Sequence, residues 1–421
     1  MNVFASSSRA RSQTQAHLRP SAPQRFLVKK LFLIAVFACT LLLAVMPWMH
    51  SDLPAVAQSS VQAPPAISEL RGVWLTNVDS DVLFSRRKLD QGMQRLANLH
   101  FNTAYPAVWN WGYSLYPSSV AERAIGRSVY PNRGLRGRNM LTEAVEAGHR
   151  HGLAVLPWFE FGLMAPAGSE LVVRHPDWVT SRSDGTQVVM EGKWPRVWLN
   201  PAHPEVQQFI VDMITEMVVN YDIDGIQLDD HFGMPYELGY DPYTIQRYQQ
   251  EHNGQRPPNN PADPEWMRWR ANHVSQLMVR VFEAVKSHKP DCVVSLSPNS
   301  QEFSYRMYLQ DWGRWEREGY VEEVIVQVYR DSINSFAAEL DRPEISQVRN
   351  HIPTAVGILA GLKDRLVDPQ LIERKVHTVR EKGLSGVAFF FYETLNDRDD
   401  LLRSLFAQPA ARPIAQSLRP T

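Results

Sequence analysis

Residues 224–232 read Asp-Gly-Ile-Gln-Leu-Asp-Asp-His-Phe. This stretch predicts a short apolar strand, beginning at Gly225, that delivers two adjacent carboxylates, Asp229 and Asp230, to a loop. Strands buried on both faces of a parallel sheet are almost continuously apolar, and an unpaired buried charge is costly. Ionisable side chains gathered where such a strand stops therefore indicate a site. Two neighbouring carboxylates suit acid–base chemistry, because the charge of one raises the pKa of the other.

Seven further apolar runs resemble this strand, and stretches with helical periodicity separate most of them. The clearest helix follows His203-Pro204-Glu205 and has apolar residues at i, i+3, i+4 and i+7 over residues 206–218. The alternation predicts the α/β class and a (β/α)8 TIM barrel with enlarged loops over residues 69–406, with a doubly wound open sheet as the alternative. The eight expected strands are 71–77, 103–109, 153–161, 225–230, 292–299, 324–329, 354–361 and 386–393.

The expected strand ends carry carboxylates, amides and aromatic rings. In a barrel of this kind the C-terminal ends of the strands form the active face. Planar polar groups bind sugar hydroxyls, and aromatic rings stack on sugar rings. The candidate catalytic residues are Asp229, Asp230, Glu160 and Glu393, and the candidate substrate-binding residues are Asn77, Trp109, Trp158, His231, Asn299, Gln327 and Tyr329.

Six motifs, in order, resemble the glycosyl-hydrolase-like 10 family of bacterial envelope proteins. The resemblance covers residues 69–406 and implies a (β/α)8 barrel, a glycan substrate and a glycoside hydrolase activity. The motifs are Arg71-Gly-Val-Trp-Leu-Thr-Asn77, residues 147–158, Asn200-Pro201, Asp224-Gly-Ile-Gln-Leu-Asp-Asp230, Ser295-Leu-Ser-Pro298 and Gln327-Val-Tyr329.

Comparison with known barrel hydrolases narrows the chemistry. The expected seventh strand ends at Gly361 without a carboxylate, which disfavours retaining enzymes with a glutamate nucleophile there. Asp229 matches the aspartate nucleophile of the alpha-amylase superfamily, but Gln227 stands where that superfamily has arginine, and Asn299 where it has glutamate.

The aspartate pair fits better with enzymes whose nucleophile is the 2-acetamido group of the substrate itself. These enzymes need one acid to protonate the leaving oxygen and a neighbouring carboxylate to orient the acetamido group. Successive side chains of a strand point to opposite faces, so both aspartates can line one site only if the strand ends or bulges there. We expect one aspartate to be the general acid and the other to stay ionised, and the sequence leaves their order open.

The other candidates have two interpretations each. Glu160 either serves as a second carboxylate or sugar ligand or joins a loop ion pair, and the same holds for Glu393. His231 either binds substrate or has a structural role. Motifs for zinc, for phosphate loops and for a nucleophile elbow are absent, so no cofactor and no metal are expected. Calcium among loop carboxylates stays open, although no EF-hand spacing argues for it.

Residues 1–57 form the expected signal peptide or membrane anchor. Six basic residues precede an apolar run over residues 31–46, and Ala55-Val56-Ala57 resembles a cleavage site. Residues 58–68 are an expected linker and 407–421 a polar tail. The protein is therefore expected to be exported to the periplasm, the cell envelope or the exterior, with membrane contact only through the leader if it is not cleaved.

The composition bears on partners. Lys and Arg number 44 against 45 Asp and Glu, so the chain has no basic excess for nucleic acid. A polysaccharide or cell-wall glycan is the expected partner. Two functions stay open: a glycoside hydrolase of an envelope or extracellular polysaccharide, in which 2-acetamido sugars are preferred, or a non-catalytic glycan-binding barrel.

Overall fold

A parallel sheet forms the centre of the computed structural model, which describes residues 67–414. The expected leader lies outside the described residues. All eight expected strands are present, and the third is split into β5 and β6. The strands are β1 (Leu70–Leu75), β2 (Thr103–Pro106), β5 (Ala154–Val155), β6 (Trp158–Phe159), β10 (Gly225–Asp229), β11 (Val293–Ser297), β12 (Glu323–Gln327), β13 (Thr354–Leu359) and β16 (Gly386–Phe390).

The sheet closes on itself through its third strand. Its order is β5-β2-β1-β16-β13-β12-β11-β10-β6, so the two ends of the sheet are consecutive pieces of one chain segment. Leu156 and Pro157 separate these pieces. The backbone bonds continue through the break: Leu156 N donates to Ala104 O at 3.0 Å, and Gln227 N donates to Pro157 O at 2.9 Å. The predicted (β/α)8 barrel is therefore confirmed, and the doubly wound alternative is excluded.

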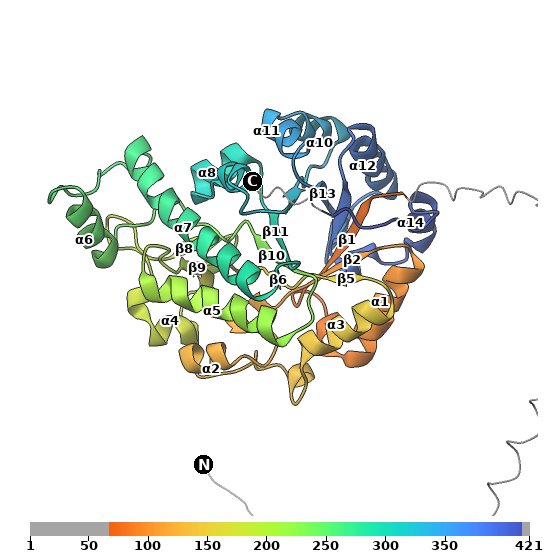
Figure 1. Ribbon diagram of the computed structural model, residues 1–421, viewed down its shortest axis with the longest axis horizontal. Helices are drawn as coiled ribbons and strands as arrows, with labels where there is room; N and C mark the ends of the chain where they lie inside the picture. Colours follow the sequence, from red (N-terminus) through yellow and green to blue (C-terminus); the bar gives the residue numbers. More distant parts are fainter. Residues whose placement is uncertain (1–66, 415–421) are drawn as a thin grey trace, which may run out of the picture. The chain divides into compact units, whose positions relative to one another are not determined.

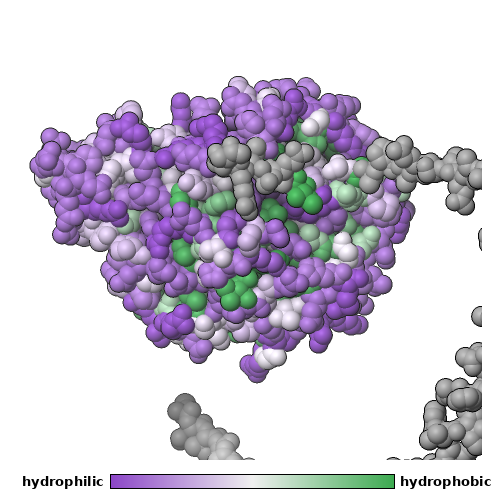
Figure 2. Space-filling view, viewed as in Figure 1, coloured by the Kyte–Doolittle hydropathy of each residue, from purple (hydrophilic) through white to green (hydrophobic). Residues whose placement is uncertain are grey.

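Helices surround the strands (Figure 1). The expected helix after His203 is α5, which begins at Pro204 and buries Val206, Phe209 and Ile210 against the barrel. Hydrophilic side chains cover most of the face seen in Figure 2, with hydrophobic ones gathered towards its middle. The helices are α1 (Arg86–Asn98), α2 (Ser119–Ile125), α3 (Met140–Arg150), α4 (Glu170–Arg174), α5 (Pro204–Asn220), α6 (Pro242–Glu251), α7 (Pro264–His288), α8 (Gln301–Tyr308), α9 (Trp312–Arg317), α10 (Ile333–Leu340), α11 (Pro343–Val348), α12 (Pro369–Glu381), α13 (Tyr392–Leu395) and α14 (Asp399–Leu405), with short 3-10 turns η1 (Val82–Phe84), η2 (Arg133–Leu135) and η3 (Pro176–Trp178).

The enlarged loops follow the C-terminal ends of the strands and contain small antiparallel sheets. One pairs β3 (Trp109–Asn110) with β4 (Tyr113–Ser114) after β2. Another has the order β7-β9-β8 after β6 and is built from β7 (Met164–Pro166), β8 (Val189–Glu191) and β9 (Trp194–Trp198). A third pairs β14 (Gly361–Leu362) with β15 (Arg365–Leu366) after β13. These additions build up the face on which active sites of barrels lie.

The first part of the expected polar tail packs against the barrel. Ser68 pairs with Ala411 in a parallel bridge, and Arg71 Nη1 donates to Gln408 O at 2.6 Å. Arg412 forms an ion pair with Glu323, whose side chain is 1% exposed. The folded unit thus extends to the end of the described residues, past the expected boundary at residue 406. Within residues 67–414 none of the helices has the length and apolar character needed to cross a membrane.

Candidate active site

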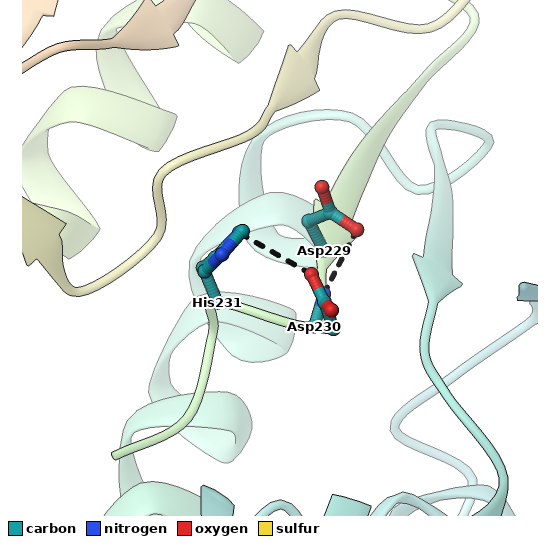
Figure 3. A group of neighbouring side chains, drawn as sticks. All are labelled: Asp229, Asp230 and His231. Carbon is teal, nitrogen blue, oxygen red and sulfur yellow. Dashed lines mark hydrogen bonds and ion pairs between the residues drawn. The ribbon is translucent and has the colours of Figure 1, made fainter. Parts of the chain in front are cut away.

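The aspartate pair lies where β10 ends. Asp229 is the last residue of the strand, and Asp230 and His231 begin the turn that follows (Figure 3). Because the strand stops at Asp229, the alternation of side chains stops with it. Asp230 can then turn back towards the same site, and its backbone N–H donates to Asp229 Oδ1 at 2.9 Å. The two aspartates can line one site only if the strand ends between them, and β10 does end at Asp229.

Asp229 is held by groups from two other strands of the sheet. Trp158 Nε1, on β6, donates to Asp229 Oδ2 at 3.0 Å, and Gln327 Nε2, on β12, donates to Oδ1 at 2.6 Å. The residue is 4% exposed. Burial, together with the charge of Asp230, raises the pKa of Asp229 well above its ordinary value. Trp158 and Gln327 therefore position this carboxylate.

Asp230 is the more accessible of the two carboxylates. Its side chain is 21% exposed, Asn299 Nδ2 donates to its Oδ2 at 2.8 Å, and His231 Nδ1 lies 3.2 Å from its Oδ1. The other ring nitrogen of His231 lies 3.0 Å from Glu191 Oε1, on β8. Burial alone would lower the pKa of His231, but the charges of Asp230, Glu191 and Asp229 outweigh it and raise the pKa to about 10. His231 is thus cationic at neutral pH and lies between two carboxylates.

The backbone of this turn fits closely against the loop after β6. Gly162 has a positive φ of 49°, and a Cβ there would lie 2.5 Å from His231 O. Leu163 N donates to the same oxygen at 3.0 Å. A glycine at this position lets the two loops meet, which fixes His231 and Asp230 relative to Glu160.

Glu160 follows β6 and opens onto a cleft of about 270 Å³. Its Oε2 accepts a hydrogen bond from Asn110, whose amide also donates to Asn77 Oδ1 at 2.8 Å. Burial raises the pKa of Glu160 to about 8, although the charge of His231 and the amide of Asn110 act in the opposite direction. Glu160 is therefore a carboxylic acid at neutral pH, which is the state that a general acid needs.

Two predicted residues lie elsewhere. Trp109 is fully buried, stacks on Phe159 with ring centroids 5.7 Å apart and has no face for a sugar, which corrects its expected role in substrate binding. Glu393, at the start of α13, accepts a hydrogen bond from Ser80 in the loop after β1. Burial raises its pKa. Its contacts among the described residues do not include the aspartate pair.

Tyr329 lies near the carboxylates. Burial, and after it the charges of Asp229, Asp230 and Glu160, raise the pKa of its phenol well above the ordinary value. Its ring centroid is 5.9 Å from that of Phe390. Most of the amides and rings expected to bind sugar thus contact or border the carboxylates.

Three cleft residues of the β8–β9 hairpin were not predicted, namely Glu191, Trp194 and Arg196. They line the cleft beside Glu160, His231 and Trp111, which follows β3. The stretches on either side of Gly192-Lys193 are rich in residues that favour strands, and glycine fits the first position of a two-residue hairpin loop. This pattern predicts a hairpin. The pattern does not show that the hairpin lies beside the carboxylates.

Asp229, Asp230 and His231 each offer one ligand atom within 4.8 Å of the others, the spacing of a metal site. Each of the three side chains already has protein partners. Asp229 accepts from Trp158 and Gln327, Asp230 accepts from Asn299, and His231 contacts Glu191. A metal would have to displace these contacts, so the donor set does not argue for one.

The fold and the carboxylates at its C-terminal face define a barrel of the glycoside hydrolase type. The chain belongs to the glycosyl hydrolase-like 10 family, whose model matches residues 69–378. It is 25% identical over 337 residues to glycosyl hydrolase DigH of Escherichia coli K12, and the matched stretch covers 68% of this chain and 70% of DigH. It is 24% identical over 397 residues to glycosyl hydrolase YngK of Bacillus subtilis 168, covering 82% of this chain and 73% of YngK.

Solved structures share the fold. The glycoside hydrolase domain of PgaB (BpsB) from Bordetella bronchiseptica matches with a TM-score of 0.60 at 15% identity, covering 80% of this chain and 98% of that domain. The catalytic domain of beta-amylase from Paenibacillus polymyxa matches with a TM-score of 0.55 at 10% identity, covering 79% and 95%.

Proposed function

We propose that this protein is a glycoside hydrolase that cleaves O-glycosidic bonds of a polysaccharide by carboxylate acid–base catalysis. The observation that carries the proposal is the state of Glu160: a carboxylic acid, with its pKa raised to about 8, that opens onto a cleft and lies close enough to Asp230 for the charge of Asp230 to act on it. Glu160 gives its proton to the leaving-group oxygen. Asp230 lies against the cationic His231, whose Nδ1 is 3.2 Å from Asp230 Oδ1, and Asp229 completes the pair.

The sequence assigned the acid role to one aspartate of the pair, but both oxygens of Asp229 are held by Trp158 and Gln327. The proposal therefore gives the acid role to Glu160 and keeps Asp230 as the carboxylate that orients a 2-acetamido sugar. In this mechanism the acetamido oxygen attacks the anomeric carbon, and Asp230 accepts a hydrogen bond from the acetamido N–H. Water then opens the intermediate, and Glu160, now a carboxylate, takes a proton from that water. Cell-wall glycan strands and other envelope or extracellular polysaccharides contain such sugars.

Export to the periplasm, the cell envelope or the exterior is part of the proposal. It rests on the basic and apolar pattern of residues 1–57. Cell fractionation followed by N-terminal sequencing tests it. A mature chain that begins near Gln58 outside the cytoplasm supports cleavage, an envelope-bound full-length chain supports the anchor, and a full-length chain in the cytoplasm contradicts export.

A non-catalytic glycan-binding barrel is the second candidate. It is favoured by one observation: both oxygens of Asp229 and both oxygens of Asp230 already have protein partners. A carboxylate that is engaged in this way can hold a fold together without doing chemistry.

Mass spectrometry of products separates the two candidates. The purified protein is incubated with peptide-free cell-wall glycan and with neutral glucans, beside Asp230→Asn. New reducing-end fragments from the unsubstituted protein, reduced about 10²–10⁴-fold by Asp230→Asn, are the expected result. Fragments from neutral glucans alone would reject the acetamido mechanism and keep the hydrolase. Binding to a glycan without any fragments would favour the binding barrel.

A further inference from the structure

Arg196 is a buried cation on the wall of the cleft. It lies on β9, its side chain is 5% exposed, and it borders the cleft that Glu160 and His231 also line. Its Nε donates to Glu191 Oε2 at 3.2 Å. The other oxygen of Glu191 is used by His231. Glu191 therefore fixes one edge of the guanidinium while it holds the turn that carries Asp230.

The guanidinium of Arg196 lies over two aromatic rings. Its central carbon lies 4.6 Å from the ring centroid of Trp111 and 5.0 Å from that of Phe161. Contacts of this kind hold the guanidinium plane in place through cation–π attraction. Besides Nε, the guanidinium carries two terminal amino groups.

Those two amino groups have no protein hydrogen-bond partner among residues 67–414, since the only side-chain hydrogen bond of Arg196 there is the one from Nε to Glu191. A guanidinium presents its N–H groups as a planar fork that matches the two oxygens of a carboxylate. A fork without protein partners, on a side chain that is otherwise buried and borders a substrate cleft, is suited to an anionic group that arrives with a ligand.

We propose that Arg196 binds a carboxylate carried by a substrate sugar, so that the cleft selects acidic glycans over neutral ones. The inference rests on the proposed function in that it takes the cleft as the glycan site. Trp194, which is 45% exposed on the same hairpin, supplies the ring face on which the sugar stacks. Lys363 also lines the cleft, but it pairs with Asp79 at 3.4 Å, so Arg196 is the cation that the proposal uses.

Calorimetric titration tests the proposal. Asp230→Asn is introduced so that the ligand is not consumed during the measurement. The ligands are a peptide-free cell-wall tetrasaccharide, whose alternate sugars carry a lactyl carboxylate, and the same tetrasaccharide with its carboxylates reduced to alcohols. Arg196→Met keeps an apolar chain between the rings and removes the donors, and Arg136→Met, an exposed arginine outside the cleft, is the matched control.

The acidic tetrasaccharide should bind at least 10-fold more tightly than the reduced one. Arg196→Met should weaken binding of the acidic form about 10- to 100-fold, the usual range for a charge-assisted pair, and change binding of the reduced form less than 2-fold. Arg136→Met should change neither. Equal affinity of the two tetrasaccharides, or an equal loss for both with Arg196→Met, would overturn the proposal.

Arg196→Lys guards against a folding defect in the methionine variant. Lysine keeps the charge but cannot form the fork, so we expect an intermediate loss for the acidic form, with a melting temperature close to that of the unsubstituted protein. Wild-type affinity for the acidic form in a folded Arg196→Lys would contradict the bidentate contact. Cleavage is measured separately with Asp230 intact. The carboxylate site fails alone if that protein cuts both tetrasaccharides equally well, and the hydrolase proposal fails alone if the acidic form binds through Arg196 but that protein never cuts it.

Discussion

The proton on Glu160 decides what the cleft can do at a given pH. Because burial raises its pKa to about 8, kcat/KM should be flat near neutrality and fall as pH rises through about 8. Glu160→Gln should lower kcat about 10²–10⁴-fold and remove this alkaline limb. Rates on peptide-free cell-wall glycan between pH 5 and 10 measure both effects, and Glu283→Gln, an exposed glutamate on α7, is the control.

The same pKa has a consequence for stability. The folded state holds a proton on Glu160 up to about pH 8, whereas the unfolded state loses it near 4.5. Glu160 therefore reduces stability as pH rises from about 4.5 to 8, and Glu160→Gln should raise Tm relative to wild type at pH 9 but not at pH 4. A Tm difference that does not change with pH would contradict the raised pKa.

The sequence predicted the positions of some site residues correctly and of others not. Asn299, Gln327 and Trp158 could be placed near the aspartates because the C-terminal ends of neighbouring parallel strands meet at one edge. Trp109 could not, because β2 ends at Pro106 and the chain then turns into a separate hairpin. Its ring packs inward on Phe159, and no local pattern distinguishes that direction.

At the scale of elements, the β8–β9 hairpin brings Glu191 to the turn after β10. Its carboxylate lies 3.0 Å from His231 Nε2 and helps to raise the pKa of His231 to about 10. Glu191→Gln removes that charge, so the pKa of His231 should fall by about 1–3 units. A titration of ¹⁵N-labelled histidine followed by NMR measures this shift.

Glu237→Gln provides the comparison, since Glu237 pairs with Arg182 rather than with His231. It should leave the titration of His231 unchanged. An unchanged His231 titration in Glu191→Gln would mean that the hairpin does not contact the turn in solution. The sequence could indicate this hairpin from Gly192-Lys193, but Glu191 and His231 are 40 residues apart, and nothing local pairs them.

The barrel as a whole followed from the alternation of apolar runs and helical stretches. Each strand is buried on its outer face by the helices and on its inner face by the core of the barrel, and this requirement repeats along the chain in a readable pattern. The split of the third strand at Pro157 and the packing of residues 407–414 had no such pattern. The tail is polar and proline-bearing, and its contact with the barrel depends on Arg412 meeting a carboxylate that is 89 positions away in sequence.

That contact gives a prediction for the stability of the whole domain. Glu323 lies inside the barrel and also accepts hydrogen bonds from Ser295 Oγ at 2.8 Å and Tyr105 OH at 3.2 Å, while Arg412 supplies its charged partner. Arg412→Met leaves this carboxylate buried without a cation, so the free energy of unfolding should fall by about 3 kcal/mol. Urea unfolding followed by tryptophan fluorescence measures it.

Two further variants test whether Arg412→Met lowers the stability because it leaves the buried Glu323 carboxylate without a cation. Arg403→Met removes an exposed arginine that pairs with Asp399 and with the fully exposed Asp400, and it should change the stability far less than Arg412→Met. Adding Glu323→Gln to Arg412→Met removes the buried charge itself and should recover part of the lost stability, because the cost lies in leaving one partner uncompensated. If the double variant is as unstable as the sum of the single changes, the two side chains are not coupled, and the tail stabilises the barrel through its backbone contacts to Ser68 and Glu69 instead.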